Sequence, residues 1–179
     1  MKSCNFPLYL SCFLLLIFTV GCQNRSDSEK AEKEDPALLE KSLLEANKVA
    51  VKTENEHIED FLRRRNWTME ETGSGLRYAI YERGNGEKAA FGKTAVLEYT
   101  CRLITGDVIY SSDKDGLKQF KIGQGGVESG LEEGILLLRV GDRAKFIIPS
   151  HLGFGLLGDQ DKVPPKSTLI YDLKLISLN

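Results

Sequence analysis

Residues 148–178 read IIPSHLGFGLLGDQDKVPPKSTLIYDLKLIS and place an apolar, glycine-rich loop between two strand-like runs. Two consecutive prolines, Pro164 and Pro165, close this loop just before the last run. Upstream, residues 120–149 (FKIGQGGVESGLEEGILLLRVGDRAKFIIP) supply a turn, a short amphipathic helix and another strand. Because turn residues separate these short elements, residues 120–178 are predicted to form one compact unit.

More strands precede this unit. Residues 76–81 alternate between two sets of side chains and lie between two glycine turns, which is typical of a β-strand. Similar runs predict strands over residues 94–103, 108–112, 143–149 and 168–178. One helix interrupts the series, because Leu131, Ile135 and Leu138 recur at helical spacing. Antiparallel strands with one short helix predict an α+β domain over residues 68–179.

A segment rich in Leu, Ala, Glu and Lys, residues 37–67, precedes the domain and is predicted to be an amphipathic helix. Charged residues occupy one side of this helix, so we expect it to be half covered. Its apolar stripe consists of Leu44, Val51, Ile58, Phe61 and Leu62. Two partners for the stripe remain open: the chain's own domain, or a second copy, which would make a homodimer through residues 37–66.

The N-terminus has the pattern of an exported lipoprotein. Residues 1–21 begin with a lysine near the start, continue through an apolar run and end in small residues, which is typical of a secretory signal rather than a membrane span. Cys22 follows directly, as in a bacterial lipobox, and is expected to carry lipid. An ordinary signal peptide with a chance cysteine is the alternative. The hydrophilic residues 22–36 predict a disordered tether.

Charge and reactive side chains exclude several classes of function. The formal net charge of −2 argues against nucleic-acid partners. Cys101 lies in a strand-like run with no histidine nearby, so a small buried residue is predicted rather than a nucleophile, and no disulfide framework is expected. The two histidines, His57 and His151, belong to no recognisable triad or metal motif. We therefore expect no hydrolase, no metal site and no cofactor.

An ordered set of short motifs resembles FKBP-type peptidyl-prolyl cis-trans isomerases over about residues 73–179. The motifs are Val96-x-x-Tyr99-Thr100, Leu103-x-x-Gly106, Ser111-Ser112, Gly123, Gly130-Leu131-Glu132-Glu133-Gly134, Val140-Gly141, Ile148-Pro149, Gly153-Phe154-Gly155, Gly158 and Pro164-Pro165. The resemblance implies an FKBP-like curved antiparallel sheet of about five strands wrapped on one short helix, with the predicted N-terminal helix as an extension. The phrases YSSD, SGLEEGI and PSHLGFG are similar to the gliding-motility-associated branch, whose members are envelope lipoproteins.

The resemblance also implies the residues of an isomerase pocket between sheet and helix. The implied pocket residues are Tyr99, Ile109, Tyr110, Leu131 and Phe154, and the implied substrate-binding residues are Val127, Glu128, Val163 and Tyr171. The backbone N–H of Glu128 is implied to receive a ligand carbonyl, and its carboxylate is expected at the rim. For Tyr99, Leu131 and Tyr171 the sequence leaves open whether they contact a ligand or belong to the core.

Three positions depart from the family pattern in ways that bear on activity. Phe154 stands where the family commonly has a tyrosine whose hydroxyl donates to the substrate, and phenylalanine has no such donor. Tyr110 replaces an aspartate, and Lys118 falls where an aromatic side chain normally lines the cleft. We therefore expect weak activity.

The implied activity is rotation about X-Pro bonds in proline-containing polypeptides, assisting the folding of envelope or secreted proteins. Uncatalysed rotation faces a barrier of about 18–20 kcal/mol and takes on the order of 10–100 s. Twisting the amide lowers the polarity of its carbonyl, so an apolar site that excludes water can favour the twisted state. A non-catalytic FKBP-fold chaperone or envelope assembly factor is the alternative. Either would be a lipoprotein anchored to a membrane and facing the periplasm of a Gram-negative bacterium.

Overall fold

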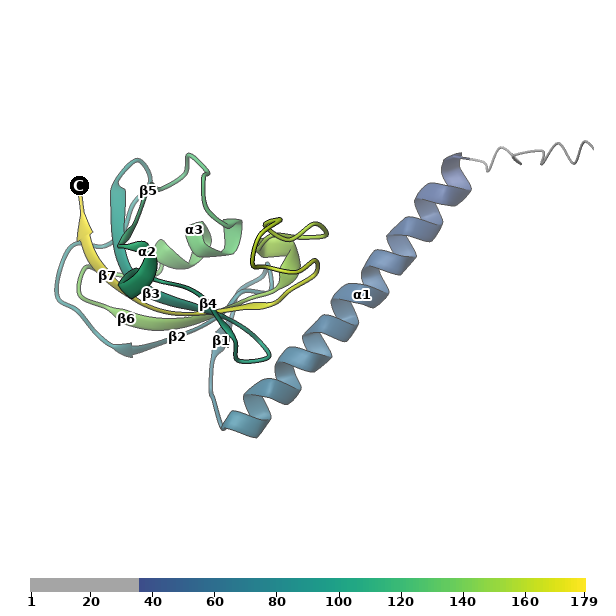
Figure 1. Ribbon diagram of the computed structural model, residues 1–179, viewed down its shortest axis with the longest axis horizontal. Helices are drawn as coiled ribbons and strands as arrows, with labels where there is room; N and C mark the ends of the chain where they lie inside the picture. The colour runs from purple at the N-terminus through teal and green to yellow at the C-terminus, as the bar shows by residue number, and fades with distance from the viewer. Residues whose placement is uncertain (1–35) are drawn as a thin grey trace, which may run out of the picture.

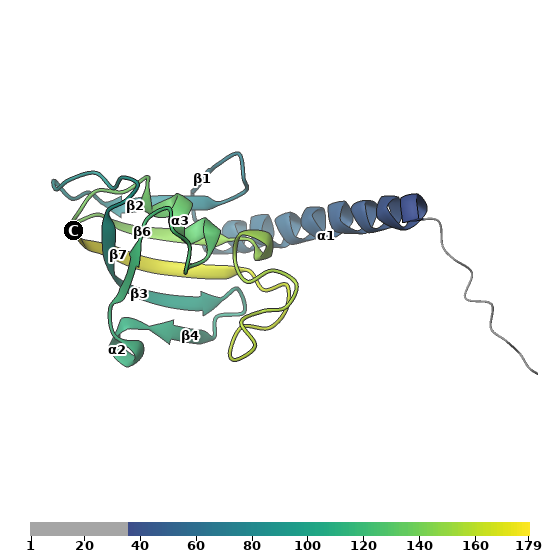
Figure 2. The same cartoon turned by 90° about the horizontal axis from the view of Figure 1, so that it is seen from above.

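The computed structural model describes residues 36–179, so the predicted signal, the predicted lipid-bearing Cys22 and nearly all of the predicted tether lie outside the described residues. Figure 1 shows a curved sheet with one helix on its concave side and the long helix α1 reaching the opposite side. Figure 2 shows the strands side by side, with α1 extending away from them. No helix within residues 36–179 combines the length and apolar character that crossing a membrane requires.

Seven strands form one antiparallel sheet in the order β1-β2-β6-β7-β3-β4, and β5 also pairs with β3. Their bounds are β1 Glu70–Glu71, β2 Arg77–Glu82, β3 Thr94–Leu103, β4 Val108–Ser111, β5 Lys118–Lys121, β6 Arg143–Ile148 and β7 Leu169–Leu178. Five of them coincide with the predicted strands to within two residues. Strands β1 and β5 were not predicted. Two residues are too few for β1 to show alternation, and in β5 only Phe120 is apolar, so its KQFK sequence shows no apolar alternation.

The central strands present alternate side chains to opposite faces of the sheet. On the concave face, Phe146 of β6 and Tyr171 of β7 are buried in the main core. Helix α3, Ser129–Ile135, covers this face with Leu131 and Ile135, neither of which is exposed. Two short helices complete the domain, α2 over Ser112–Asp115 and the 3-10 helix η1 over Ser150–Leu152. The α+β architecture with one short helix in the concavity is confirmed.

Helix α1, Pro36–Arg65, packs on the other face of the same strands. Ile58, Phe61 and Leu62, near its C-terminal end, form a second buried cluster with Ile147 of β6 and Ile170 of β7. The N-terminal part of the predicted stripe behaves differently, since Leu44 and Val51 are 55% and 39% exposed. The C-terminal part of the stripe therefore packs on the chain's own domain, whereas its N-terminal part stays exposed.

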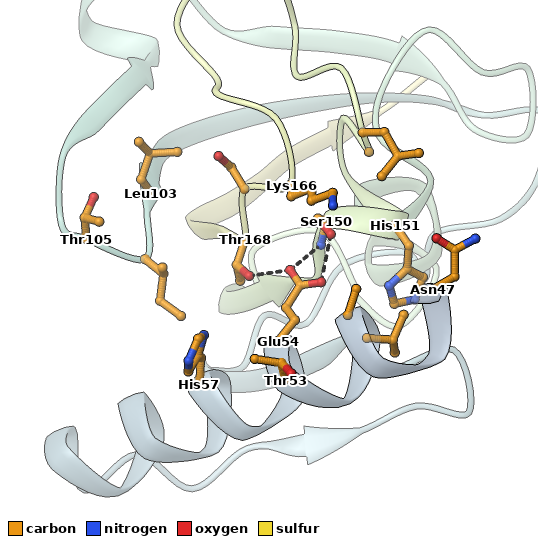
Figure 3. Close-up of a pocket in the computed structure, with 16 residues that line it drawn as sticks. Asn47, Thr53, Glu54, His57, Leu103, Thr105, Ser150, His151, Lys166 and Thr168 are labelled. Atoms are coloured by element: carbon orange, nitrogen blue, oxygen red, sulfur yellow. Dashed lines mark hydrogen bonds between the residues drawn. The ribbon is translucent and has the colours of Figure 1, made fainter. Parts of the chain in front are cut away.

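Polar contacts add to this docking of α1. Glu54 accepts hydrogen bonds from the Ser150 backbone N–H (2.7 Å), the Ser150 hydroxyl (2.7 Å) and the Thr168 hydroxyl (2.5 Å), as Figure 3 shows. Beside these contacts lies a groove of about 760 Å³ between α1 and the domain. On β2, the buried Arg77 guanidinium lies 3.0 Å from the Glu59 carboxylate. Acidic side chains of α1 therefore contact the segment after β6, the residue just before β7, and strand β2.

Replacing Glu54 tests how much this contact stabilises the domain. We expect Glu54→Ala to lower the free energy of unfolding by about 1–2 kcal/mol, because three donors lose a charged acceptor. Glu56→Ala is the matched control, since Glu56 is exposed and its one ion pair within residues 36–179 is with the Lys52 ammonium, 4.0 Å away. Urea unfolding measures both variants, and hydrogen exchange of the Ser150 amide should accelerate in Glu54→Ala alone. Equal effects of the two variants would contradict this role.

Candidate functional site

The nine predicted site residues come from five separate segments, and the fold brings them to the concave face of the sheet. Tyr99, Leu131, Val163 and Tyr171 belong to the main core cluster, and Ile109, Tyr110, Val127 and Phe154 pack against it. Glu128 joins them through a hydrogen bond with Tyr171. The contributing segments are β3, β4, the start of α3 with the two residues before it, the loop over residues 153–168, and β7.

Burial divides these residues into an interior set and an accessible set. Tyr99, Leu131 and Tyr171, which the sequence left between core and ligand contact, are at most 6% exposed and form the interior with Val163. The half-buried members are Ile109, Tyr110, Val127 and Phe154. A substrate approaching the folded domain would therefore meet this second set first, and three of its four side chains are wholly hydrocarbon.

Two tyrosines form the aromatic interior of the site. The rings of Tyr99 and Tyr171 lie 5.9 Å apart and are tilted by 30°. Burial raises the pKa of the Tyr99 hydroxyl, and it raises the pKa of the Tyr171 hydroxyl well above its ordinary value. Both hydroxyls therefore stay protonated near neutral pH, and that of Tyr171 acts as a hydrogen-bond donor.

The side chain of Glu128 lies deeper in the domain than predicted. Its carboxylate was expected at the rim, but the residue is only 5% exposed, and its Oε1 atom accepts a 2.6 Å hydrogen bond from the Tyr171 hydroxyl. The side chain turns inward because this buried hydroxyl offers it a donor. Its backbone N–H, which the resemblance implied as a ligand contact, has no hydrogen-bond acceptor within residues 36–179.

The side chain of Lys118 also reaches the aromatic interior. Its ammonium lies 5.4 Å from the Tyr99 ring centroid and 5.6 Å from that of Tyr171. It donates to the Tyr171 hydroxyl at 3.3 Å and lies 3.5 Å from the Glu128 carboxylate. A charged group thus stands beside the two rings, as the departure from the family pattern at this position predicted.

Tyr110 fixes the loop that carries Phe154. Its hydroxyl donates to the Asp159 carboxylate, which also accepts the backbone N–H groups of Asp161 (2.9 Å) and Val163 (2.7 Å). Burial alone would raise the pKa of Asp159, but these hydrogen bonds hold it below its usual value. Sequence reasoning missed this pairing, because residues 49 positions apart with a turn-rich loop between them give no local signal.

Cys101 lies in the same core, and its thiol is unreactive. Its side chain is fully buried, and burial raises the pKa of the thiol to about 12. The thiolate is the reactive form of cysteine, so this residue contributes no nucleophile at neutral pH. Within residues 36–179, no three His, Cys, Asp or Glu side chains gather closely enough to hold a metal ion.

Comparison with known proteins assigns the family. The sequence pattern of the FKBP-type peptidyl-prolyl cis-trans isomerases matches residues 85–176. The chain belongs to this family. All nine predicted site residues lie within the matched segment, and their roles in binding stay a prediction.

Individual FKBP-type proteins resemble parts of the chain. A probable FKBP-type peptidyl-prolyl cis-trans isomerase FkpA of Neisseria meningitidis is 39% identical over 60% of this chain, and FK506-binding protein 2 of Dictyostelium discoideum is 42% identical over 51% of it. The chain spans 39% of the first relative's length and 70% of the second's.

Solved structures agree with this assignment. The crystal structure of FkpA from Escherichia coli has a TM-score of 0.63 and 27% identity, covering 82% of this chain and 74% of that one. The crystal structure of AtFKBP13 has a TM-score of 0.60 and 29% identity, covering 63% of this chain and all of that one. The FKBP fold found by both comparisons is the one that the motifs of residues 73–179 implied.

Proposed function

We propose that the protein is a peptidyl-prolyl cis-trans isomerase that accelerates rotation about X-Pro bonds in polypeptide clients. The observation that carries the proposal is the family match over residues 85–176, which contains all nine site residues. Their half-buried members Ile109, Val127 and Phe154 offer hydrocarbon surface to a prolyl ring. The reaction breaks no covalent bond, so a site without nucleophile or base suits it: exclusion of water favours the less polar, twisted amide.

A protease-coupled assay with a proline-containing peptide tests this proposal. We expect the folded protein to accelerate cis-to-trans conversion, and circular dichroism checks that the sample is folded. A rate equal to the uncatalysed rate, with folded protein at micromolar concentration, would contradict the proposal.

Restoring a hydroxyl at Phe154 should raise the activity. Phe154→Tyr supplies a donor to the substrate carbonyl, and one such hydrogen bond contributes about 1 kcal/mol, so kcat/KM should rise about fivefold. Phe91→Tyr makes the same chemical change at a side chain that is 74% exposed and outside the site, and it should leave kcat/KM unchanged. An unchanged rate in folded Phe154→Tyr would instead assign the weak activity to the substitutions at Tyr110 and Lys118.

The departures at Phe154 and Lys118 favour a second candidate, a non-catalytic FKBP-fold chaperone or envelope assembly factor. A chaperone would suppress aggregation of an unfolded client that contains no slow prolyl step. If suppression occurs while the peptide assay shows no acceleration, this second function replaces the first.

We further propose that the protein is a lipoprotein of the gliding-motility-associated branch, held to an envelope membrane through Cys22 and facing the periplasm. The lipobox-like cysteine and the hydrophilic residues after it support this, as do the motifs shared with that branch. Labelling with a palmitate analogue in the native bacterium tests the anchor. Cys22→Ser should abolish the label and release the protein from membranes, whereas Cys101→Ser should keep both.

We propose that the uncovered part of α1 joins two copies of the chain. The supporting observation is a group of exposed apolar side chains, each at least 44% exposed, on the N-terminal half of the helix: Leu38, Leu39, Leu43, Leu44 and Val49. Light scattering should give twice the chain mass for the intact protein and the monomer mass after deletion of residues 37–50. This deletion spares Ile58, Phe61 and Leu62, which the domain itself needs. A monomer mass before deletion would contradict pairing.

A further inference from the structure

A buried ionic network lies within the proposed site, and three elements supply it. Lys118 comes from β5, Glu128 immediately precedes α3, and Tyr171 comes from β7. The Tyr171 hydroxyl donates to Glu128 Oε1 at 2.6 Å and accepts from the Lys118 ammonium at 3.3 Å. The second carboxylate oxygen, Glu128 Oε2, lies 3.5 Å from that ammonium. The three side chains thus form a closed triangle of contacts.

A contribution to fold stability is a weak explanation for this network. A buried ion pair stabilises a protein only when its geometry is good and its other hydrogen-bonding capacity is satisfied, and apolar groups of similar volume often stabilise as well. Here Glu128 Oε2 is buried, and no hydrogen-bond donor reaches it within residues 36–179. A buried polar atom without a hydrogen-bond donor is uncommon in folded proteins, so Glu128 Oε2 calls for an explanation beyond packing.

The two charged side chains of the network differ in exposure, and this difference indicates which kind of ligand would bind. The Glu128 side chain is 1% exposed, whereas that of Lys118 is 21% exposed, so a bound molecule meets the cation. An ammonium has three donors, and the one hydrogen bond that the Lys118 ammonium makes within the described residues goes to the Tyr171 hydroxyl. The same ammonium lies within 6 Å of the Tyr99 and Tyr171 ring centroids. The Lys118 ammonium therefore has N–H donors left for a ligand that binds beside the Tyr99 and Tyr171 rings.

We propose that Lys118 makes this site selective for proline-containing segments with an acidic residue next to the proline. The inference rests on the proposed function, because it assumes that the prolyl ring binds at the half-buried set around Phe154. Ile109, Val127 and Phe154 pack on the core cluster that contains Tyr99 and Tyr171, and the Lys118 ammonium lies within 6 Å of both tyrosine rings. A residue next to a prolyl ring bound at this face is thus presented to the same face as the ammonium. A charge-assisted hydrogen bond to Lys118 then favours Asp or Glu over an uncharged residue of the same size.

The test compares peptides that differ in one group. Two pairs are used, with Glu or Gln immediately before or immediately after the proline, and kcat/KM is measured with the full chain. We expect a Glu/Gln ratio of about ten for at least one pair, and a smaller ratio in 1 M salt because a partly exposed cation is screened. Lys118→Met should bring the ratio near one, and Lys118→Arg should keep it well above one. Lys121→Met, on the same strand with an exposed side chain, is the control that should preserve it.

The outcomes separate this inference from the function on which it rests. A wild-type ratio of one for both pairs, or an unchanged ratio in folded Lys118→Met, overturns the inference even if the protein is an active isomerase; a lower melting temperature alone would then mark the network as structural. If none of the four peptides is isomerised, the proposed function fails. Calorimetry then tests the inference by comparing the affinity of the Glu peptide with that of the Gln peptide in each pair. Equal or weaker binding of the Glu peptide in both pairs overturns the inference in this measurement as well.

Discussion

Phe61→Ala is expected to lower the free energy of unfolding by about 3–5 kcal/mol, the range typical of removing a buried aromatic side chain. Phe61 is 5% exposed and lies in the cluster that joins α1 to Ile147 and Ile170 of the sheet. It also meets the Trp67 ring edge to face at 5.6 Å, so the truncation leaves a cavity with an aromatic wall. Urea unfolding followed by tryptophan fluorescence measures the loss directly, because Trp67 is the single tryptophan of the chain.

Leu44→Ala is the control for this prediction. Leu44 belongs to the same apolar stripe of the sequence but is 55% exposed, so its truncation should change the free energy of unfolding by less than about 0.5 kcal/mol. If Phe61→Ala proves as mild as Leu44→Ala, the end of α1 is not part of the folded domain. The measurement is made at low protein concentration, where pairing of two chains through the N-terminal half of α1 would not contribute.

Gly134→Ala should also be strongly destabilising, by about 1–3 kcal/mol, and should reduce activity. A β-carbon at Gly134 would lie 2.4 Å from Cε2 of Phe146, a ring with no exposed surface. Alanine normally favours a helix over glycine by about 1 kcal/mol, so a net loss would show that packing outweighs helix propensity here. Because α3 also carries Leu131, moving this helix away from the sheet should lower kcat/KM as well as the melting temperature.

The matched control is Gly73→Ala. Gly73 has open space around the added carbon and no positive φ angle, so the melting temperature and kcat/KM should both stay close to the wild-type values. A stabilised Gly134→Ala protein would mean that α3 does not approach the sheet as closely as this structure has it.

Local sequence patterns were sufficient to predict most strands of the sheet and to recognise the family. Strands such as β3 and β7, ten residues each, are long enough for alternation to be visible, and their turns carry glycine. The motifs around Gly130 and Gly153 have fixed spacings and are readable without any structure. The same motifs assign the nine predicted site residues position by position, and the structure places them on one face of the sheet, whereas their roles in binding stay a prediction.

Other features depend on contacts between distant parts of the chain. Whether the stripe of α1 faces its own sheet could not be decided, because Ile147 and Ile170 give it a partner only once β6 and β7 are paired. The inward turn of Glu128 likewise depends on the Tyr171 hydroxyl, 43 residues away in the sequence. Side-chain direction at a loop residue is set by such partners rather than by local propensity.

The docking of α1 determines how a mechanical load would pass through the molecule. Its 30 residues are about 45 Å long, and the buried contacts with the sheet lie in the last turns. The helix would therefore act as a lever when its N-terminal end is pulled. Its buried contacts would transmit the force to strands β6 and β7. These are the strands whose opposite faces carry Phe146 and Tyr171, so tension on the helix would be felt first by the framework that supports the site.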